Sequence, residues 1–268
     1  MGLRIGNFSA WAAQRNLART GELVARSLER LSSGRRLNSA ADGAADLSIA
    51  ETFRAQIVSL GAAQNNAGQG IALAQVADSA LGEVSELLIR MREIAVQSAN
   101  GTLGSSERAS LQEEFEGLRS EITRIGNTTE FNGQSPLGGS DVDIQVGANA
   151  GDTITVSGVQ VTATDLGVDG LTVSTAGGAG SALGGIDGAI QQVASLRSQF
   201  GTAQRRLESA VRLLGVQIEG TSRAESILRD ADFALEVATL TRNQILQEAG
   251  IAALAQSNQN LGLLLRLL

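Results

Sequence analysis

The chain has 268 residues and a net charge of −7, and its composition excludes most kinds of enzyme. It contains no histidine, cysteine, tyrosine or lysine, so it lacks an imidazole base, a thiol nucleophile and a Schiff-base amine. Metal binding would depend on carboxylates alone. We therefore expect a protein that is not an enzyme, with no catalytic residues, no cofactor and no metal site.

The charge is unevenly distributed along the chain. Residues 1–54 carry eight arginines and five acidic residues, and residues 190–268 carry eight and seven. Residues 55–189 carry only five arginines and 16 acidic residues. We therefore expect the central part of the chain to present a hydrated, acidic surface. The sequence shows neither a signal peptide nor about 18 consecutive apolar residues that could span a membrane. We expect neither nucleic acid nor a membrane as a partner.

Near the N-terminus, apolar residues at helical spacing predict a helix that is interrupted near Gly34. These residues are Ala10, Ala13, Leu17, Val24, Leu28 and Leu31. A second helix is predicted at about residues 57–99. A third begins near Ser105 or Ser106, either of which can cap it, with Glu107 in its first turn.

Residues 133–189 differ from the helical segments because they contain 14 glycines. The strings DVDIQV and TITVSGVQVTA alternate in polarity as strands do, and GANAGD between them predicts a hairpin turn. The string STAGGAGSALGG predicts a flexible connection to the last long helix. A small β region therefore interrupts an otherwise helical chain.

From Ile186 onward, apolar residues follow a seven-residue repeat that predicts a coiled-coil seam. One register comprises Ile186, Val193, Phe200, Leu207, Leu214, Thr221, Leu228 and Leu235. The companion register comprises Ala189, Leu196, Ala203, Ala210, Gln217, Ala224, Ala231, Ala238, Ile245 and Ala252. Small residues in the companion register allow close approach of a partner helix. We expect the two ends of the chain to pair with each other in a mainly α fold of long antiparallel helices.

Five strings, in their order along the chain, resemble bacterial flagellin. They are ERLSSGRRLNSAADGAADLSIA (29–50), MREIAVQSANGT (91–102), TEFNG (129–133), IQVGANAGDTI (144–154) and RDADFALEVATLTRNQILQEAG (229–250). The resemblance implies a structural subunit of the flagellar filament that is exported unfolded and polymerised outside the cell. It further implies that the fold has coiled-coil termini, a small β-hairpin region and no large central insertion.

The resemblance also implies how the chain is divided. An inner coiled-coil domain would comprise residues 1–42 and 225–268, and an outer rod domain would comprise residues 43–172 and 186–224. The rod would hold the hairpin at about residues 137–172. Residues 173–185 would form a short Gly-rich connection where most flagellins carry a variable domain. Gly34, Arg35, Asn38 and Gly43 would form the joint between the two domains.

The coiled coil that directs assembly is expected to use apolar residues from both ends of the chain. We predict Leu17, Val24, Leu28, Leu31, Leu228, Leu235, Ile245, Leu261, Leu264, Leu265 and Leu268. Six of the last eleven residues are leucine, and one partner helix can cover only one face of them. We therefore expect both ends to be mostly disordered before assembly and to become helical when neighbouring subunits cover them.

The resemblance implies further partners besides other copies of the chain. These are a flagellar export chaperone, the filament cap, the hook-associated proteins and an innate immune receptor for flagellin. Arg90, Ile94 and Glu114 fall in motifs that engage this receptor in many flagellins. The alternative role for these three residues is contact between neighbouring subunits in the filament.

Three other functions compete with the filament subunit. A hook-filament junction protein of the flagellum has similar ends, but the string IQVGANAGDTI favours flagellin. An enzyme acting through carboxylates is disfavoured because no motif supports it. A cytoplasmic coiled-coil signalling module is disfavoured by the β region between the helical ends.

Overall fold

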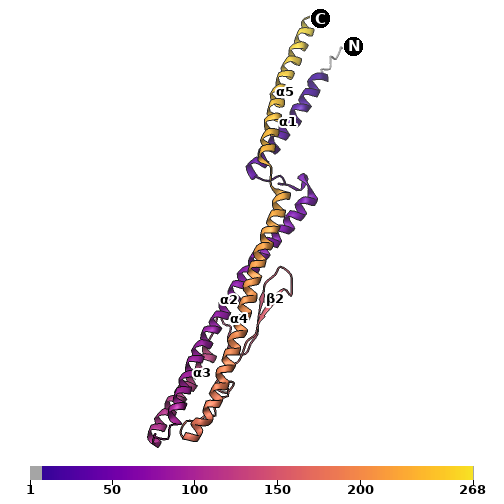
Figure 1. Ribbon diagram of the computed structural model, residues 1–268. Helices are drawn as coiled ribbons and strands as arrows, with labels where there is room; N and C mark the ends of the chain where they lie inside the picture. The colour runs from indigo at the N-terminus through magenta and orange to yellow at the C-terminus, as the bar shows by residue number, and fades with distance from the viewer. Residues whose placement is uncertain (1–7, 268) are drawn as a thin grey trace. The chain divides into compact units, whose positions relative to one another are not determined.

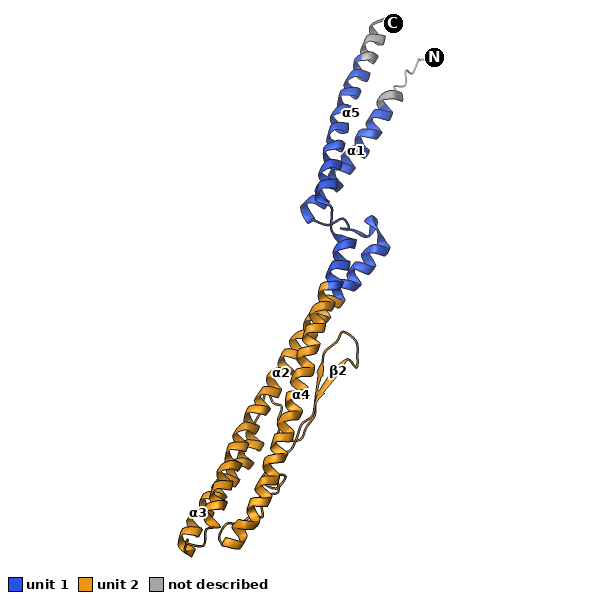
Figure 2. Cartoon of the chain, viewed as in Figure 1, with its two compact units in different colours: residues 1–55, 220–268 blue, residues 56–219 orange. Residues whose placement is uncertain are grey.

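The computed structural model describes the backbone of residues 8–267 and the side chains of residues 11–257 and 259. The chain is mainly helical and divides into two compact units (Figures 1 and 2). Unit 1 comprises residues 1–55 and 220–268, and unit 2 comprises residues 56–219. The predicted divisions at residues 42/43 and 224/225 therefore both fall inside unit 1.

Five α-helices, a 3-10 helix and one pair of strands make up the described part of the chain. The helices are α1 (Phe8–Ser33), α2 (Ala44–Ser98), α3 (Ser105–Thr128), α4 (Ala176–Arg229) and α5 (Phe233–Leu267), with the 3-10 helix η1 (Ala40–Asp42) before α2. The strands are β1 (Val142–Gln145) and β2 (Thr153–Val156). The boundary between the units falls within α2 and within α4. In the described residues, no helix combines the length and the hydropathy needed to cross a membrane.

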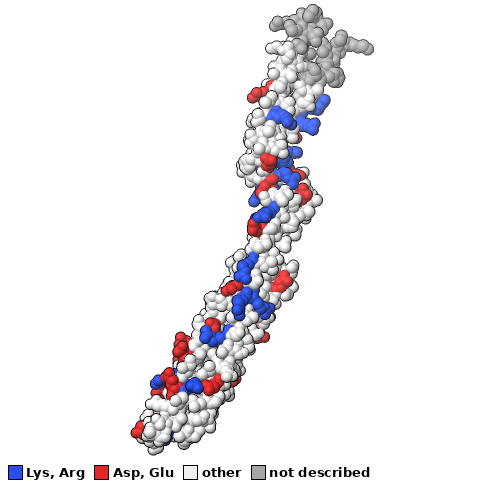
Figure 3. Space-filling view, viewed as in Figure 1, with Lys and Arg blue, Asp and Glu red and all other residues white. Residues whose placement is uncertain are grey.

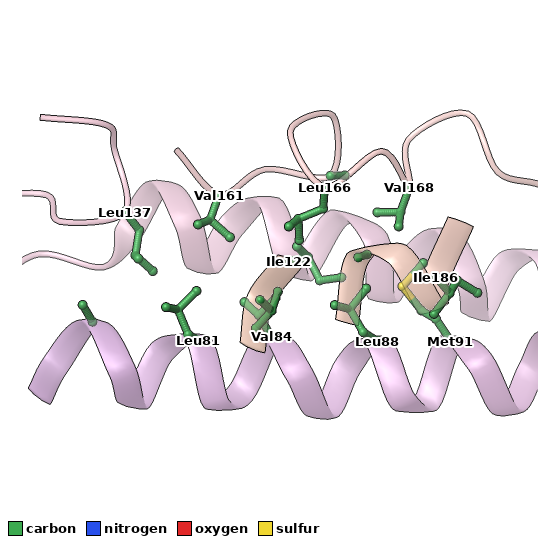
Figure 4. Packing of buried hydrophobic residues seen from close by; sticks show 14 of the residues in the cluster. Leu81, Val84, Leu88, Met91, Ile122, Leu137, Val161, Leu166, Val168 and Ile186 are labelled. Carbon is green, nitrogen blue, oxygen red and sulfur yellow. The ribbon is translucent and has the colours of Figure 1, made fainter. Parts of the chain in front are cut away.

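The core of unit 2 lies between α2, α3, α4 and the irregular chain that follows the hairpin. Figure 4 shows side chains of α2 pointing toward Ile122 of α3 and Ile186 of α4. Leu137, Val161 and Val168 cover these helices from the irregular chain. Apolar side chains spaced by three and four residues keep one face of each helix buried, which is what makes these three helices pack together.

The predicted seven-residue repeat is confirmed along the part of α4 that lies in unit 2. Its large register is buried at Ile186, Val193, Phe200, Leu207 and Leu214. Ion pairs flank this seam, because Arg92 of α2 contacts Asp187 at 2.7 Å and Arg197 contacts Asp78 of α2 at 2.8 Å. The seam therefore joins α2 to α4 within one subunit.

The predicted hairpin is also confirmed. Strands β1 and β2 pair antiparallel, with Val142 opposite Val156 and Ile144 opposite Ile154. In the turn, the carboxylate of Asp152 accepts hydrogen bonds from the backbone and side-chain N–H groups of Asn149. The string GANAGD thus forms the turn that its composition predicts.

The prediction of a flexible connection at residues 173–185 is wrong for most of that segment, because α4 begins at Ala176. Thr175 starts the helix by accepting the N–H of Gly178 on its hydroxyl. Ala179 and Ala182 are completely buried in the core of unit 2. Their small side chains let α4 pack closely, which offsets the low helix propensity of the surrounding glycines. Similarly, α2 begins at Ala44, well before the predicted residue 57.

Candidate assembly surface

A break in the helix separates α4 from α5. Asp230 forms an isolated antiparallel bridge with Arg35, and the N–H of Ala231 donates to the carbonyl of Gly34 at 3.0 Å. Gly34 has φ +70, a backbone conformation that suits glycine. The carboxylate of Asp232 then caps α5 by accepting the N–H groups of Ala234 and Leu235. The last long helix of the prediction is therefore two helices.

Helices α1 and α5 run side by side in opposite directions within unit 1 (Figure 1). The Cδ1 atom of Leu17 lies 3.5 Å from the position that a Cβ atom on Gly250 would take. Near the other end of the pair, Arg30 contacts Glu236 at 3.8 Å. These contacts fix the register of the pair and confirm that the two ends of the chain pair with each other.

The face of α5 that meets α1 combines polar and apolar side chains. Residues spaced by three and four are half-buried or buried along it: Glu236, Leu240, Asn243, Gln247, Gly250 and Leu254. The matching face of α1 comprises Ala13, Leu17, Thr20, Val24, Ser27 and Leu31. Asn243 is 6% exposed and Ser27 is 3% exposed, so the buried centre of this pair includes polar side chains.

Large apolar side chains instead lie on the outside of the α1–α5 pair. We call them the terminal apolar surface, which comprises Trp11, Leu23, Leu28, Leu235, Val237, Ile245, Leu246 and Ile251. Leu235 is 66% exposed and Ile245 is 60% exposed. Leu235 and Ile245 do not occupy the predicted seam positions, because after the break at residues 230–232 the residues that face α1 are Glu236, Asn243 and Gln247 instead. Leu28 is likewise exposed, because Ser27 takes the buried position.

The other predicted coiled-coil residues differ in their surroundings. Leu17, Val24 and Leu31 are half-buried on the face of α1 that meets α5. Leu228 is half-buried near the end of α4. The side chains of Leu261, Leu264, Leu265 and Leu268 lie outside the described residues.

Five members of the terminal apolar surface were not predicted: Trp11, Leu23, Val237, Leu246 and Ile251. The available signal was that α5 carries apolar residues all round its axis, which is typical of a helix covered on every side.

The four residues predicted to form the joint lie between α1 and α2, within unit 1. Besides the bridge of Arg35 to Asp230, the side chain of Asn38 donates to the hydroxyl of Ser33 at 2.9 Å. The carbonyl of Gly43 accepts the N–H of Leu47 and so begins α2. The sequence correctly predicts a break and a fresh helix start in this segment.

Arg229 holds the neighbouring chain segments of unit 1 together. Its side chain is mostly buried and contacts Glu51 of α2 at 3.0 Å and Glu225 at 3.4 Å. The guanidinium of Arg36 donates to the carbonyl of Leu228 at 2.7 Å. Arginine therefore joins the end of α4 both to α2 and to the segment that follows α1.

Asp42 anchors the short helix η1 by accepting several hydrogen bonds. The backbone N–H of Ser39 is the main cause that lowers the pKa of Asp42 below its ordinary value of 3.8. The hydroxyl of Ser39, the backbone N–H of Asn38 and the guanidinium of Arg30 lower it further, while partial burial opposes them. Arg30 also contacts Glu236, so one guanidinium links η1 to α5.

We predict that acid weakens this part of unit 1. Because the folded pKa of Asp42 is depressed, its stabilising contribution is present above about pH 4 and is lost as the pH falls through the folded pKa. NMR titration of the Asp42 carboxyl should give a midpoint below 3.8, with amide protection of residues 38–42 falling in parallel. Asp42→Asn should remove this pH dependence. A midpoint at or above 3.8 would contradict the prediction.

The three residues that were predicted as a subunit or receptor contact do not share one surface. Arg90 of α2 lies at the surface and donates to Glu114 of α3 at 2.8 Å and to Glu93 at 3.0 Å. The hydrogen bond to Glu114 is the main cause that raises the pKa of Arg90. Ile94 is 1% exposed and belongs to the core of unit 2, so its predicted surface role is wrong. Ile89 and Val96 are the exposed apolar side chains near it on α2.

Comparisons with known proteins agree with this architecture. The pattern of the bacterial flagellin N-terminal helical region matches residues 6–141, and that of the C-terminal helical region matches residues 183–268. A flagellin of Halalkalibacterium halodurans is 41% identical over 268 residues, which cover 98% of each chain. Flagellin FlaB1 of Treponema pallidum is 35% identical over 271 residues, covering 94% of each chain.

Two solved structures share the fold. The crystal structure of Bacillus cereus flagellin has a TM-score of 0.51 and 32% identity, and the match covers 56% of this chain and 88% of that one. A structure assigned provisionally as a flagellar hook-associated protein of Vibrio parahaemolyticus has a TM-score of 0.59 over 70% of this chain and 99% of that one, but only 16% identity. That level of identity shows a shared fold alone. Because the relatives that match nearly the whole chain are flagellins, the hook-filament junction alternative is not favoured. The chain belongs to the bacterial flagellin family and is a structural subunit of the flagellar filament.

Proposed function

We propose that this flagellin polymerises by burying its terminal apolar surface against other copies of the chain. The observation that carries the proposal is the arrangement of the α1–α5 pair, whose buried centre includes Ser27 and Asn243 while Leu235 and Ile245 face outward. Eight large apolar side chains lie on this surface, and burying each contributes roughly 1.5–3 kcal/mol. Association itself costs about 4–15 kcal/mol, so burial of this surface is large enough to offset it.

The same reasoning predicts that the two units differ in stability before assembly. The core of unit 2 is buried within one subunit, so we expect unit 2 to remain folded in the monomer. The α1–α5 pair is expected to be mostly disordered in the monomer, since partly polar seams contribute little stability. An unfolded end is also suited to export through a narrow channel. We propose that residues 34–43 form the joint between the inner coiled coil and the outer rod.

Amide hydrogen exchange on freshly dissociated monomer tests the proposal. Residues 11–33 and 233–257 should exchange rapidly in the monomer and become protected in the filament, because neighbouring copies then cover them. The helical residues of unit 2 should be protected in both states and serve as the internal control. Strong protection of α1 and α5 in the monomer would contradict the proposal.

The further partners are proposed for two different surfaces. An export chaperone, the cap and the hook-associated proteins would cover the terminal apolar surface before or at the ends of assembly. A variant with serine at Leu235, Ile245 and Ile251 should therefore lose affinity for the purified chaperone.

The innate immune receptor would contact Arg90 and Glu114, which are exposed, and the core residue Ile94 takes no part. Activation of receptor-bearing cells should then be lost in an Arg90→Ala variant.

A further inference from the structure

A polar groove lies between the hairpin and α4 in unit 2. It has a volume of about 320 Å³. Its lining comprises Thr155, Val156 and Ser157 of the hairpin segment and Ser195, Ser198, Gln199, Phe200, Thr202, Ala203 and Arg206 of α4. Val156, Phe200 and Ala203 are buried and form an apolar floor, whereas the remaining side chains are polar. No acidic side chain lines it.

Several donors in the groove have no bonding partner among the described residues. The hydroxyls of Thr155 and Thr202 are used internally, since they donate to Asp143 and to the carbonyl of Ser198. In the described interactions, the side chains of Ser157, Ser195 and Arg206 make no hydrogen bond or ion pair, although all three line the groove. The groove therefore presents a guanidinium and neighbouring hydroxyls that remain available to a ligand.

Arg206 belongs to a minority of the arginines of unit 2. Residues 56–219 contain 18 acidic residues and nine arginines, giving a charge of −9. Six of the nine bind a carboxylate or a carbonyl of the same subunit. The exceptions among the described interactions are Arg205, Arg206 and Arg212, all on α4. Of these three, only Arg206 lines the groove. On the face shown in Figure 3, acidic side chains of unit 2 gather toward α3.

We propose that this groove binds the carboxylate of an aspartate or glutamate side chain from a second copy of the chain in the filament. A guanidinium with adjacent hydroxyls is well suited to a carboxylate, which can accept two parallel N–H donors. The neighbours in a homopolymer are copies of the same acidic unit, so charge complementarity favours this occupant. The inference rests on polymerisation as proposed above and adds a specific contact for unit 2.

The test uses the absence of lysine from the chain. Arg206→Lys introduces the only side-chain amine, and a carbodiimide joins an amine directly to a carboxylate in contact with it. The variant would be copolymerised as a minority with wild-type protein, so that filaments form in any case. Labelling the wild-type chains with 15N distinguishes cross-links between chains from those within one chain. Arg212→Lys is the matched control, since Arg212 is exposed on the same helix but does not line the groove.

We expect the Arg206→Lys copolymer to give a cross-link to one acidic peptide of a labelled chain, and the Arg212→Lys copolymer to give much less. Exclusion of Arg206→Lys from filaments that accept Arg212→Lys would also support the contact. Arg206→Glu should raise the critical concentration at least tenfold, and Arg212→Glu less than about twofold. Filaments that contain Arg206→Lys but give no cross-link between chains, or equal cross-linking in both variants, would overturn the proposal. Growth of the control filaments shows that polymerisation itself is intact.

Discussion

Replacing Leu235, Ile245 and Ile251 together with serine should abolish filament growth at concentrations where the wild-type chain polymerises. All three side chains are more than half exposed on α5. If assembly buries them, their loss costs roughly 4.5–9 kcal/mol per subunit. Because each 1.4 kcal/mol changes an equilibrium tenfold, the critical concentration should rise at least about 1000-fold. Sedimentation of filaments over a concentration series measures this directly.

The matched control replaces Gln244 and Glu248 with serine. Both are exposed on the same helix and polar in the wild-type chain, so the double variant should polymerise almost normally. The thermal unfolding of unit 2 should be unchanged in both variants, since α5 belongs to unit 1. Normal filament growth by the triple variant would show that assembly buries a different surface.

Gly126→Ala should strongly destabilise unit 2. Gly126 is buried in α3, and a Cβ atom there would lie 1.7 Å from the carbonyl oxygen of Val161. The obstacle is backbone, so the chain at Val161 must move and disturb the buried residues that follow it. We expect a loss of at least about 3 kcal/mol, the upper end for overpacking. For a unit of this size, that lowers the melting temperature by about 6–12 °C in calorimetry of the monomer.

Gly117→Ala is the control, and it should change the stability of unit 2 in the opposite direction. Gly117 lies in the same helix, but no atom comes within 4 Å of its added Cβ. Alanine is about 0.5–1 kcal/mol more favourable than glycine in a helix, so this variant should be slightly more stable than wild type. Similar melting temperatures for the two variants would show that Val161 accommodates the methyl group.

Repeating patterns made most of the fold predictable. The seven-residue repeat that contains Ile186 and Leu214 correctly identifies the buried face of α4, and the turn between the strands follows from its glycine and aspartate residues. The start of α4 at Ala176 was not predictable from local composition. Glycine-rich sequence usually favours loops, but here the buried alanines pack against the core of unit 2, and tertiary contacts override propensity.

The limits of the sequence pattern are clearest in the assembly surface. The repeat continues in the sequence through Leu235 and Ile245, yet three residues without helical structure separate α4 from α5. The break follows from backbone bonds to Gly34 and Arg36, nearly 200 residues away, which no local pattern reveals. Ile94 illustrates a similar limit: its motif resembles a receptor contact, but packing places the side chain in the core.

Helices α1 and α5 stand at opposite ends of the sequence, which has a consequence for the timing of folding. The hairpin forms from neighbouring residues, and unit 2 is complete once residue 219 is available. Helix α1 meets its partner only after more than 200 further residues have been made, and closing so long a loop delays folding. Of the described helices, α1 is synthesised first but is among the last to acquire its tertiary contacts, so its apolar side chains stay uncovered in a newly made chain throughout that interval.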